Sequence, residues 1–552
     1  MGRRTIHSML PSLPTLPALL EHIGHPRQPK RPSLLQFAIV LIAGSAHAAS
    51  IAWPFAFWLA QGQPVWWLQL LALGVLVWQL DRGISVKRAA WLGGLFATAM
   101  LCGTFWWLFI SMHRYGGLAA PLAVLAIVAL ATFLGLYYAA ATGAFVALAP
   151  VARVGRAWRA LVFAALWLLA ELARVKLFTG FPWGEGGYAH VDGWARPLAA
   201  WIGVHGLTWL AALVAAWLVM LLRASKGPRW GMALVILALG FAAAQLPARD
   251  AAYKKESPAA PPAALSVTLL QGNIPQNEKF QPGTGVATAL QWYGEQLRDA
   301  KTSLVVAPET AIPLLPQQLP EAYGAALQSR FAKGQQAALI GIPLGSHQSG
   351  YANSVIGLKP AASAGPGEIY RYDKHHLVPF GEFIPPGFKW FTQMMNIPLG
   401  DFNRGAVGQA SFEWRGERLA PNVCYEDLFG EELGARFGDP AAAPTMFVNV
   451  SNIGWFGNTV AIDQHLHISR MRALEFNRPM LRATNTGATA IIDHRGQVTH
   501  SLARHTRGVL VGEVEGRSGI TPYAWWVSRY GLWPLWALGL AVVGLALVSR
   551  RR

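Results

Sequence analysis

The sequence predicts a multi-pass α-helical membrane domain joined to an α/β soluble domain. Of the 552 residues, 53% are hydrophobic and only 13% are charged, which is too apolar for a soluble protein of this size. Apolar runs, most of them close to the roughly 20 residues that cross a bilayer, fill the first half of the chain. From Pro258 to about Tyr523, short β-type runs alternate with helical ones.

Eight apolar runs predict eight transmembrane helices, seven of them within residues 34–250 and the last within residues 526–552. The runs are 34–50, 65–80, 90–112, 118–149, 160–173, 198–222, 230–246 and 529–549. The run 118–149 is long enough for one tilted helix and an interfacial piece. The first run ends in Ala46-His47-Ala48 and resembles a cleavable signal peptide, but apolar sequence continues beyond it and favours an uncleaved helix.

The net charge of +18 lies largely in short clusters between the apolar runs, which is the positive-inside pattern of a membrane protein and does not indicate a nucleic-acid partner. With the basic segment 1–33 in the cytoplasm, the loops 81–89, 150–159 and 223–229 fall on the same side, and each contains three Lys or Arg residues. Residues 251–525 then form a soluble domain outside the cytoplasm. The basic C-terminal tail returns to the inside.

Two features near the outer ends of the spans allow more than one interpretation. The segment 180–188 (GFPWGEGGY) is aromatic and glycine-rich, so it can anchor the chain at the interface or contact substrate. Glu171 and Arg174, about one helical turn apart, can pair with each other or reach the interface.

The soluble domain is expected to be a layered α/β domain, because strands and helices alternate in a mixed order. The expected strands are 265–272, 303–307, 337–343, 351–358, 368–372, 418–424, 445–451, 486–493 and 508–515. The expected helices are 285–299, 320–332, 427–437 and 459–477.

Three polar residues stand where expected strands end: Glu309, Lys374 and Cys424. Strand ends are where sites assemble in α/β sheets, and a carboxylate, an ammonium and a thiol are sufficient for acyl transfer. Each also has an ordinary structural interpretation, as an exposed charge or a core cysteine. A cysteine at a strand-to-helix turn is expected to have a lowered thiol pKa, because the helix N-terminus favours thiolate.

Motifs around these residues carry a family resemblance. APET (307–310), DKHHLVPFGEF (373–383) and NVCYED (422–427) resemble the carbon–nitrogen hydrolase, or nitrilase, superfamily with its Glu-Lys-Cys triad. The resemblance implies an α-β-β-α sandwich. Such a domain before the last of eight membrane helices resembles the bacterial apolipoprotein N-acyltransferase family.

The likeness to this family covers most of the chain. It extends to GFPW (180–183), QGNIPQ (271–276), SNIGWFG (451–457), RMRALEFNRPMLRATNTGATA (470–490) and GITPY (519–523). The sequence departs from the family pattern at Phe280, where a larger aromatic such as Trp is expected. This departure puts the role of the loop around Phe280 in doubt.

The resemblance implies that Cys424 is the nucleophile, that Glu309 is the general base, and that Lys374 holds the oxyanion with the backbone N–H of Tyr425. Ordinary Glu and Cys pKa values differ by roughly four units in the wrong direction for this proton transfer. The site must therefore shift one of the two pKa values or transfer the proton only as substrate arrives.

Three further residues are implied as catalytic support. Glu382 matches a fourth acidic residue of the family and is expected to orient Lys374 or to assist proton transfer. Tyr425 and Glu426 are expected to lie next to the reacting groups. For Glu426, an ordinary charge at a helix N-terminus is an open alternative.

The residues 380–402 are too apolar for an ordinary solvated loop, and exposed apolar patches of this size usually mark membrane or ligand contact. They can face an acyl chain or be buried in a core. The candidate substrate-binding residues are Phe280, Phe388, Trp390, Phe391, Met394, Trp455 and Phe456.

The resemblance implies transfer of an acyl chain from a membrane phospholipid, through a thioester on Cys424, to the N-terminal diacylglyceryl-cysteine of an apolipoprotein. The implied location is a bacterial inner membrane, with the catalytic domain in the periplasm. No cofactor and no metal are implied; His465 and His467 do not face one another on a helix, and Cys102 and Cys424 are too few for a Cys-based zinc site. A water-using membrane amidase or nitrilase and a polytopic transporter with an outer binding domain are the alternatives, although a transporter predicts more polar residues in the spans.

Overall fold

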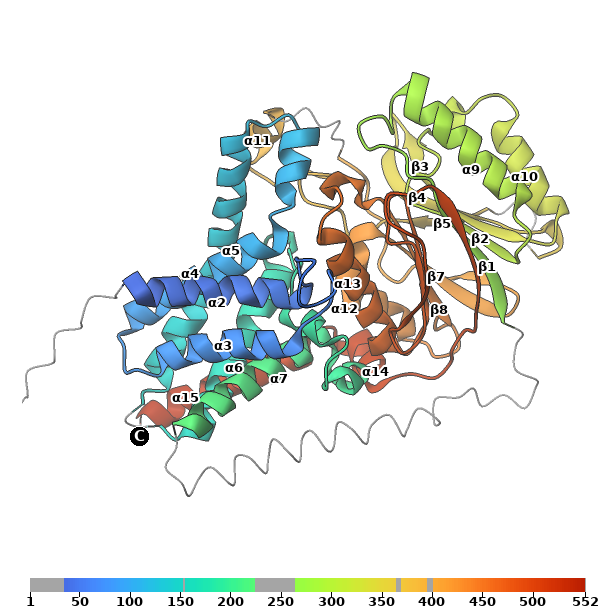
Figure 1. Cartoon of the computed structure of the whole chain (residues 1–552). Helices are drawn as coiled ribbons and strands as arrows, with labels where there is room; N and C mark the ends of the chain where they lie inside the picture. The colour runs from blue at the N-terminus through green and yellow to red at the C-terminus, as the bar shows by residue number, and fades with distance from the viewer. Residues whose placement is uncertain (1–33, 152–153, 224–263, 364–368, 395–400, 552) are drawn as a thin grey trace, which may run out of the picture.

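The structure of the chain is a computed structural model that describes residues 34–151, 154–223, 264–363, 369–394 and 401–551. A bundle of apolar helices forms one side of the molecule and a layered α/β domain forms the other (Figure 1). The last helix returns from the α/β domain to the bundle and packs against α6.

The bundle contains the apolar runs that the described residues cover. Its helices are α2 (Leu34–Ile51), α3 (Trp66–Leu80), α4 (Val86–Phe105), α5 (Ala120–Leu148), α6 (Arg156–Lys176), α7 (Ala199–Leu222) and α15 (Trp533–Arg551). Four segments are long and apolar enough to cross a membrane: Leu34–Ile51, Ala120–Leu148, Arg196–Leu222 and Trp533–Arg550. This is a membrane protein with several candidate spans.

The details of the bundle differ from the expected runs in two places. The run 118–149 forms one continuous helix of 29 residues, with no separate interfacial piece. The run 90–112 ends its α-helix at Phe105, and a short π-helix follows at Ile110–Tyr115. The run 230–246 and the basic segment 1–33 lie outside the described residues, so the count of eight spans and the domain boundaries stay predictions.

The α/β domain contains two six-stranded mixed sheets. The first has the order β12-β1-β2-β3-β4-β5, and the second has the order β11-β10-β9-β8-β7-β6. The strands of the first sheet are β1 (Leu265–Gln271), β2 (Leu304–Ala307), β3 (Ala337–Ser346), β4 (Gly350–Leu358), β5 (Tyr370–Asp373) and β12 (Gly508–Val514). Those of the second are β6 (Phe412–Trp414), β7 (Glu417–Val423), β8 (Met446–Ser451), β9 (Met480–Thr484), β10 (Ala490–Ile492) and β11 (Val498–Ser501).

Each sheet has three parallel central strands flanked by antiparallel ones. The parallel strands are β1, β2 and β3 in the first sheet and β7, β8 and β9 in the second. Central strands such as β2 (LVVA) and β8 (MFVNVS) are buried at every residue, because both faces of each sheet are covered. The carboxyl ends of two of these parallel strands, β2 and β7, precede Glu309 and Cys424.

Helices complete four layers. The helices α9 (Ala287–Asp299) and α10 (Tyr323–Lys333) cover the outer face of the first sheet, while α13 (Ala461–Phe476) covers the outer face of the second and faces the helix bundle (Figure 1). Apolar side chains from both sheets form the layer between them. The predicted α-β-β-α sandwich is therefore confirmed.

Two predicted elements of this domain were wrong. The helix 427–437 is instead three short pieces: a 3₁₀ helix at Cys424–Leu428, α12 at Gly430–Gly434 and a 3₁₀ turn at Ala435–Phe437. The strand 486–493 is shorter than predicted: a turn precedes it and only β10 (Ala490–Ile492) forms, while β9 (Met480–Thr484) was not predicted. In that turn the Thr484 hydroxyl accepts a hydrogen bond from the Gly487 N–H at 2.9 Å, and Gly487 has a φ of 117°.

Helix α13 joins the α/β domain to the bundle. The buried side chain of Gln464 accepts hydrogen bonds from the indole N–H groups of Trp107 (3.0 Å) and Trp183 (2.8 Å). Its amide donates to the carbonyl oxygen of Thr104 at 3.0 Å. Every polar atom of this side chain is thus used by the bundle, which holds the α/β domain in one orientation against it.

Candidate active site

Cys424 lies directly after β7, at a strained turn. Its φ of 51° is in the left-handed region, which costs a non-glycine residue free energy and persists only where surrounding contacts hold it. Those contacts are made to the Cys424 carbonyl oxygen, which lies 3.2 Å from Asn449 Nδ2 and 3.2 Å from His465 Nε2. The turn places the half-buried Cys424 at the carboxyl end of the second sheet.

His465 is itself held in one orientation by buried neighbours. Arg482 donates to His465 Nδ1 at 2.8 Å, so the ring proton of the neutral imidazole is on Nε2. That nitrogen lies 2.9 Å from Asp427 Oδ1, and the Asp427 carboxylate also accepts from Ser469 at 2.6 Å. His465 therefore supports the backbone of Cys424.

Lys374 and two carboxylates meet beside this turn. Lys374 Nζ lies 2.8 Å from Glu382 Oε2 and 3.6 Å from Glu309 Oε1, and all three side chains are nearly buried. Cys424 lies close enough to interact electrostatically with Glu309, Lys374 and Glu382. The structure thus brings together the three residues that the sequence placed at strand ends, Glu309, Lys374 and Cys424, with Glu382, which only the family resemblance implied.

Asn353, from β4, connects the two carboxylates. Its Nδ2 donates to Glu309 Oε1 at 2.7 Å and to Glu382 Oε1 at 2.8 Å. The backbone N–H of Asn452 donates to the other oxygen of Glu309 at 2.8 Å, and Val378 N–H donates to Glu382 Oε2 at 2.9 Å. With every carboxylate oxygen hydrogen-bonded, the two side chains have little rotational freedom.

The Cys424 thiol is neutral at rest. Desolvation and the charge of Glu309 raise the pKa of Cys424 to about 12, while Lys374 and the hydroxyl of Ser451 act in the opposite direction. The expected lowered pKa was wrong, because a five-residue 3₁₀ helix follows the cysteine and a carboxylate stands next to it. Although burial lowers the pKa of Lys374, Glu382 and Glu309 raise it above its ordinary value, so the ammonium stays charged.

Glu426 bridges the two loops that carry Lys374 and Cys424. Its Oε1 accepts from the backbone N–H groups of His375 (2.6 Å) and His376 (3.2 Å). Its Oε2 accepts from the Val423 N–H (2.6 Å) and from the Tyr372 hydroxyl (2.8 Å). It is buried and also caps the N-terminus of the 3₁₀ helix that begins at Cys424, so the alternative of a charge at a helix N-terminus describes part of its role.

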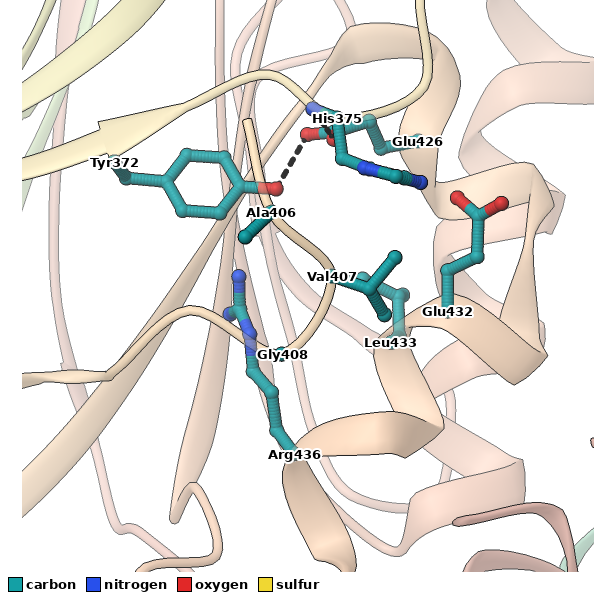
Figure 2. Close-up of a pocket in the computed structure, with 9 residues that line it drawn as sticks. All are labelled: Tyr372, His375, Ala406, Val407, Gly408, Glu426, Glu432, Leu433 and Arg436. Atoms are coloured by element: carbon teal, nitrogen blue, oxygen red, sulfur yellow. Dashed lines mark hydrogen bonds between the residues drawn. The ribbon is translucent and has the colours of Figure 1, made fainter. Parts of the chain in front are cut away.

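Figure 2 shows Glu426 at one side of a small cavity, with the Tyr372 hydroxyl pointing to its carboxylate. The cavity volume of about 10 Å³ is enough for a single water. Glu432 and Arg436 line it from the segment after Glu426, and Cys424 does not line it. This cavity is too small for an acyl chain.

The segment 178–183 of the membrane domain contacts the residues around Cys424. Phe178, Thr179 and Gly180 all have positive φ, of 55°, 71° and 82°. This backbone presents the Thr179 carbonyl to His376 Nε2 at 3.2 Å and the Gly180 carbonyl to the Tyr425 hydroxyl at 3.3 Å. The segment therefore does more than anchor the chain at the interface, since Tyr425 is the neighbour of Cys424.

Glu171 and Arg174 hold this segment in place. They form an ion pair at 2.6 Å with both side chains fully buried. Arg174 also donates to the carbonyl oxygens of Phe181 (3.2 Å) and Trp183 (2.7 Å). Of the two alternatives for this pair, the structure shows mutual pairing.

The candidate substrate-binding side chains, six aromatic residues and one methionine, lie in three places. Phe388, Trp390 and Met394 are exposed on and beside the short helix α11 (Lys389–Gln393), and Phe391 packs against Leu118 and Ala123 at the start of α5, near which Figure 1 shows α11. Phe456 packs on Trp107 with ring centroids 4.2 Å apart, and Trp455 lies near Tyr115 at 5.7 Å. Phe280 is exposed on the turn after β1. Residues 395–400 of the apolar loop are outside the described part of the chain.

Sequence reasoning missed several polar residues of the site. Asn353 and Ser354 interrupt the mainly apolar run 351–358, and that interruption was the available signal. Lys279, next to Phe280, is buried and donates to the Glu309 carbonyl at 3.0 Å. In the described parts of the chain, no group of three or more His, Cys, Asp or Glu residues is placed to hold a metal ion.

Comparison with known proteins finds two families along the chain. Residues 45–217 match the family described as the apolipoprotein N-acyltransferase N-terminal domain, and residues 266–522 match the carbon–nitrogen hydrolase family. An apolipoprotein N-acyltransferase of Verminephrobacter eiseniae is 62% identical over 91% of this chain and 94% of its own length. One from Ralstonia nicotianae is 42% identical over 88% and 90%.

Solved structures with a similar chain path include the carbon–nitrogen hydrolase of Helicobacter pylori. It is 17% identical, covers 50% of this chain and 94% of its own, and has a TM-score of 0.34.

Proposed function

The chain belongs to the apolipoprotein N-acyltransferase family, and we propose that it transfers an acyl chain from a membrane phospholipid to the α-amino group of the N-terminal diacylglyceryl-cysteine of apolipoproteins. The observation that carries this proposal is the meeting of Glu309, Lys374 and Glu382 beside the strained turn of Cys424. The site contains a nucleophile, a base and a cation, which is what acyl transfer needs.

In the first half-reaction, the Cys424 sulfur attacks the ester carbonyl of the phospholipid. Glu309 takes the thiol proton as the carbon–sulfur bond forms, since the thiol is neutral at rest. The ammonium of Lys374 and the backbone N–H of Tyr425 stabilise the oxyanion. The ester carbon–oxygen bond then breaks, the lysophospholipid oxygen receives the proton from Glu309, and a thioester remains on Cys424.

In the second half-reaction, the neutral α-amino group of the apolipoprotein attacks the thioester. Glu309 accepts a proton from the amine and returns it to the departing sulfur, which leaves an amide and the free thiol. Water would hydrolyse the same thioester, so the amine must be favoured by exclusion of water. The contacts of the segment 178–183 with Tyr425 and His376 support a site built against the membrane domain.

The remaining residues take supporting roles in this proposal. Glu382 orients Lys374, to which it is ion-paired, and Glu426 holds together the loops of Lys374 and Cys424. The exposed aromatic side chains around α11, together with Phe280, Trp455 and Phe456, contact the acyl chains of donor and acceptor. No cofactor takes part.

The proposed location is a bacterial inner membrane. In it, residues 251–525 lie in the periplasm between a seventh and an eighth span, while the segment 1–33 and the basic tail lie in the cytoplasm. The short-loop charge pattern supports this orientation.

The decisive experiment is incubation of the purified protein with phospholipid in the absence of an amine acceptor. An acyl mass is expected on the peptide that contains Cys424, and it should disappear when a diacylglyceryl peptide with a free N-terminus is added. An unmodified thiol with donor present, or full activity in Cys424→Ala, would contradict the proposal. Release of free fatty acid at a rate independent of any amine would instead indicate a water-using hydrolase.

The roles of the base and the cation have their own test. Glu309→Gln and Lys374→Met are expected to fold but not to form the thioester. Cys102→Ala is the matched control, because Cys102 lies on α4 of the bundle, away from the site. No acyl mass is expected on Cys102 itself, either in the wild type or in the Glu309 and Lys374 variants. Acylation at the wild-type rate in either site variant would refute the role of that residue.

A further inference from the structure

Lys279 is a buried lysine that the proposed reaction does not use. It lies on the turn after β1, 2% exposed, and its Nζ donates to the backbone carbonyl of Glu309 at 3.0 Å. The backbone N–H of Lys279 donates to the Pro275 carbonyl at 3.0 Å, and this hydrogen bond closes the turn. Gly285 packs so closely on this turn that a β-carbon there would lie 2.1 Å from the Glu278 carbonyl oxygen, so the backbone around Lys279 has little room to move.

The same turn is tied to the group that holds the Glu309 carboxylate. Gln276 Oε1 accepts from Asn452 Nδ2 at 2.8 Å, and the Asn452 N–H donates to Glu309 Oε2 at 2.8 Å. Lys279 and Asn452 therefore fix the backbone and the side chain of Glu309, respectively. Thr310, directly after Glu309, has a φ of 47°, so this strand end is also strained.

The charges of the site explain why a second cation is needed. Glu309 and Glu382 share the single donor Asn353 Nδ2, at 2.7 and 2.8 Å, so the two carboxylates are close neighbours. Lys374 faces both, at 3.6 and 2.8 Å, and its single positive charge leaves one negative charge in excess. Two carboxylates near one another tend to share a proton, and a protonated Glu309 cannot accept the proton of the Cys424 thiol.

We propose that Lys279 is a positioning residue that acts through Glu309: its ammonium fixes the Glu309 backbone and offsets the second negative charge, so that Glu309 stays ionised as the base. This inference rests on the proposed function, because it assigns Lys279 a role in the acylation of Cys424. The groups that face Glu309 are then Lys279 from the turn after β1, Lys374 and Glu382 from the loop after β5, Cys424 after β7, and the dipoles of Asn353 and Asn452.

The electrostatic balance at Lys279 agrees with this role. Burial lowers the pKa of Lys279 to about 8, although Glu309 and Cys424 act to raise it. The ammonium form of Lys279 therefore predominates at neutral pH and below.

The test is the rate of acyl-enzyme formation in a single turnover, measured by intact mass with phosphatidylethanolamine in detergent micelles, between about pH 5 and about pH 9. Lys279→Gln keeps a hydrogen-bond donor but removes the charge, and Lys279→Met removes both. In both variants the fall of the acylation rate at acidic pH (the acidic limb of the profile) should shift to higher pH by about one unit. The cause is the loss of the positive charge of Lys279 near Glu309, in a site with an effective dielectric constant near 20. Lys279→Arg should restore the wild-type limb, and Lys301→Gln, on an exposed lysine of the same domain, should leave it in place.

The outcomes separate this inference from the proposed function. A wild type without any acyl adduct would refute the proposed function, whereas a wild type that acylates together with an unmoved limb in Lys279→Gln would refute only the role of Lys279. A rate lowered equally at every pH would also overturn it, because a purely structural role predicts that result. Thermal unfolding of each variant shows which of them fold. If Lys279→Arg does not fold, the comparison of the acidic limb of Lys279→Gln with that of the wild type still tests the role of Lys279.

Discussion

Glu426→Gln tests whether one buried carboxylate holds the loops of Lys374 and Cys424 together. The carboxylate accepts four hydrogen bonds, of which three come from backbone N–H groups on those two loops. All four partners donate, and an amide offers only one accepting oxygen. Its NH₂ group would therefore turn toward Val423 and Tyr372, because the Tyr372 hydroxyl can also accept a hydrogen bond; the Val423 N–H then loses its acceptor.

The size of the effect follows from the number of bonds lost. A hydrogen bond to a charged group contributes about 1.5–3 kcal/mol, so the loss of the bond from the Val423 N–H gives about 1.5–3 kcal/mol of destabilisation. Glu432→Gln is the matched control on the next turn of the chain. Glu432 is 20% exposed and contacts His376 Nδ1 at 3.0 Å, so its substitution should cost less than about 1 kcal/mol.

The assay is thermal unfolding in detergent together with acyl-enzyme formation from phospholipid. Glu426→Gln should unfold at a clearly lower temperature than the wild type and should form the thioester slowly or not at all. Glu432→Gln should match the wild type in both. Equal stability and equal acylation in Glu426→Gln would refute the conclusion that this carboxylate holds the two loops in place.

Three further outcomes are expected. Because the pKa of Cys424 is about 12, the rate of its alkylation by iodoacetamide without substrate should rise about tenfold per pH unit, with no plateau below about pH 11. The rate is read on the peptide that contains Cys424, and a plateau near neutral pH would show a resting thiolate. Gln464→Leu leaves the buried indole N–H groups of Trp107 and Trp183 without their acceptor and should lower the unfolding free energy by about 2–5 kcal/mol, and unchanged thermal unfolding would contradict this. Trp390→Ala should raise the KM for long-chain phospholipid while the acylation rate with a short-chain soluble ester stays the same; equal effects on both substrates would exclude an acyl-chain contact.

Several parts of the fold follow from local patterns in the sequence. Strands such as β2 and β8 are buried on both faces and consist mainly of apolar residues, so their existence and their ends could be predicted. The apolar helices of the bundle could be predicted from length and composition in the same way. Errors arose where short polar side chains control the backbone, as in the turn that Thr484 closes between β9 and β10.

The candidate site could be predicted only in part. Glu309, Lys374 and Cys424 were found because each follows a strand and lies in a motif with a family likeness. Asn353 and Lys279 were missed, since neither stands at a strand end and each contacts residues distant in sequence. Asn353 contacts Glu309 and Glu382, which are 44 and 29 positions away, and Lys279 contacts Glu309, which is 30 positions away. The pKa of the thiol was also wrong from sequence alone, because it depends on burial and on a carboxylate 115 positions away in the chain (Glu309 to Cys424).

By itself, the sequence determined the two-part architecture and the residue types available for acyl transfer. These depend on composition and on short-range periodicity, which are properties of neighbouring residues. Only the tertiary structure decided that Glu426 bridges two loops, that the segment 178–183 of the membrane domain reaches Tyr425, and that Lys279 donates to the Glu309 carbonyl. Such contacts join residues far apart in the chain, and their geometry is set by sheet register and by the packing of the two domains.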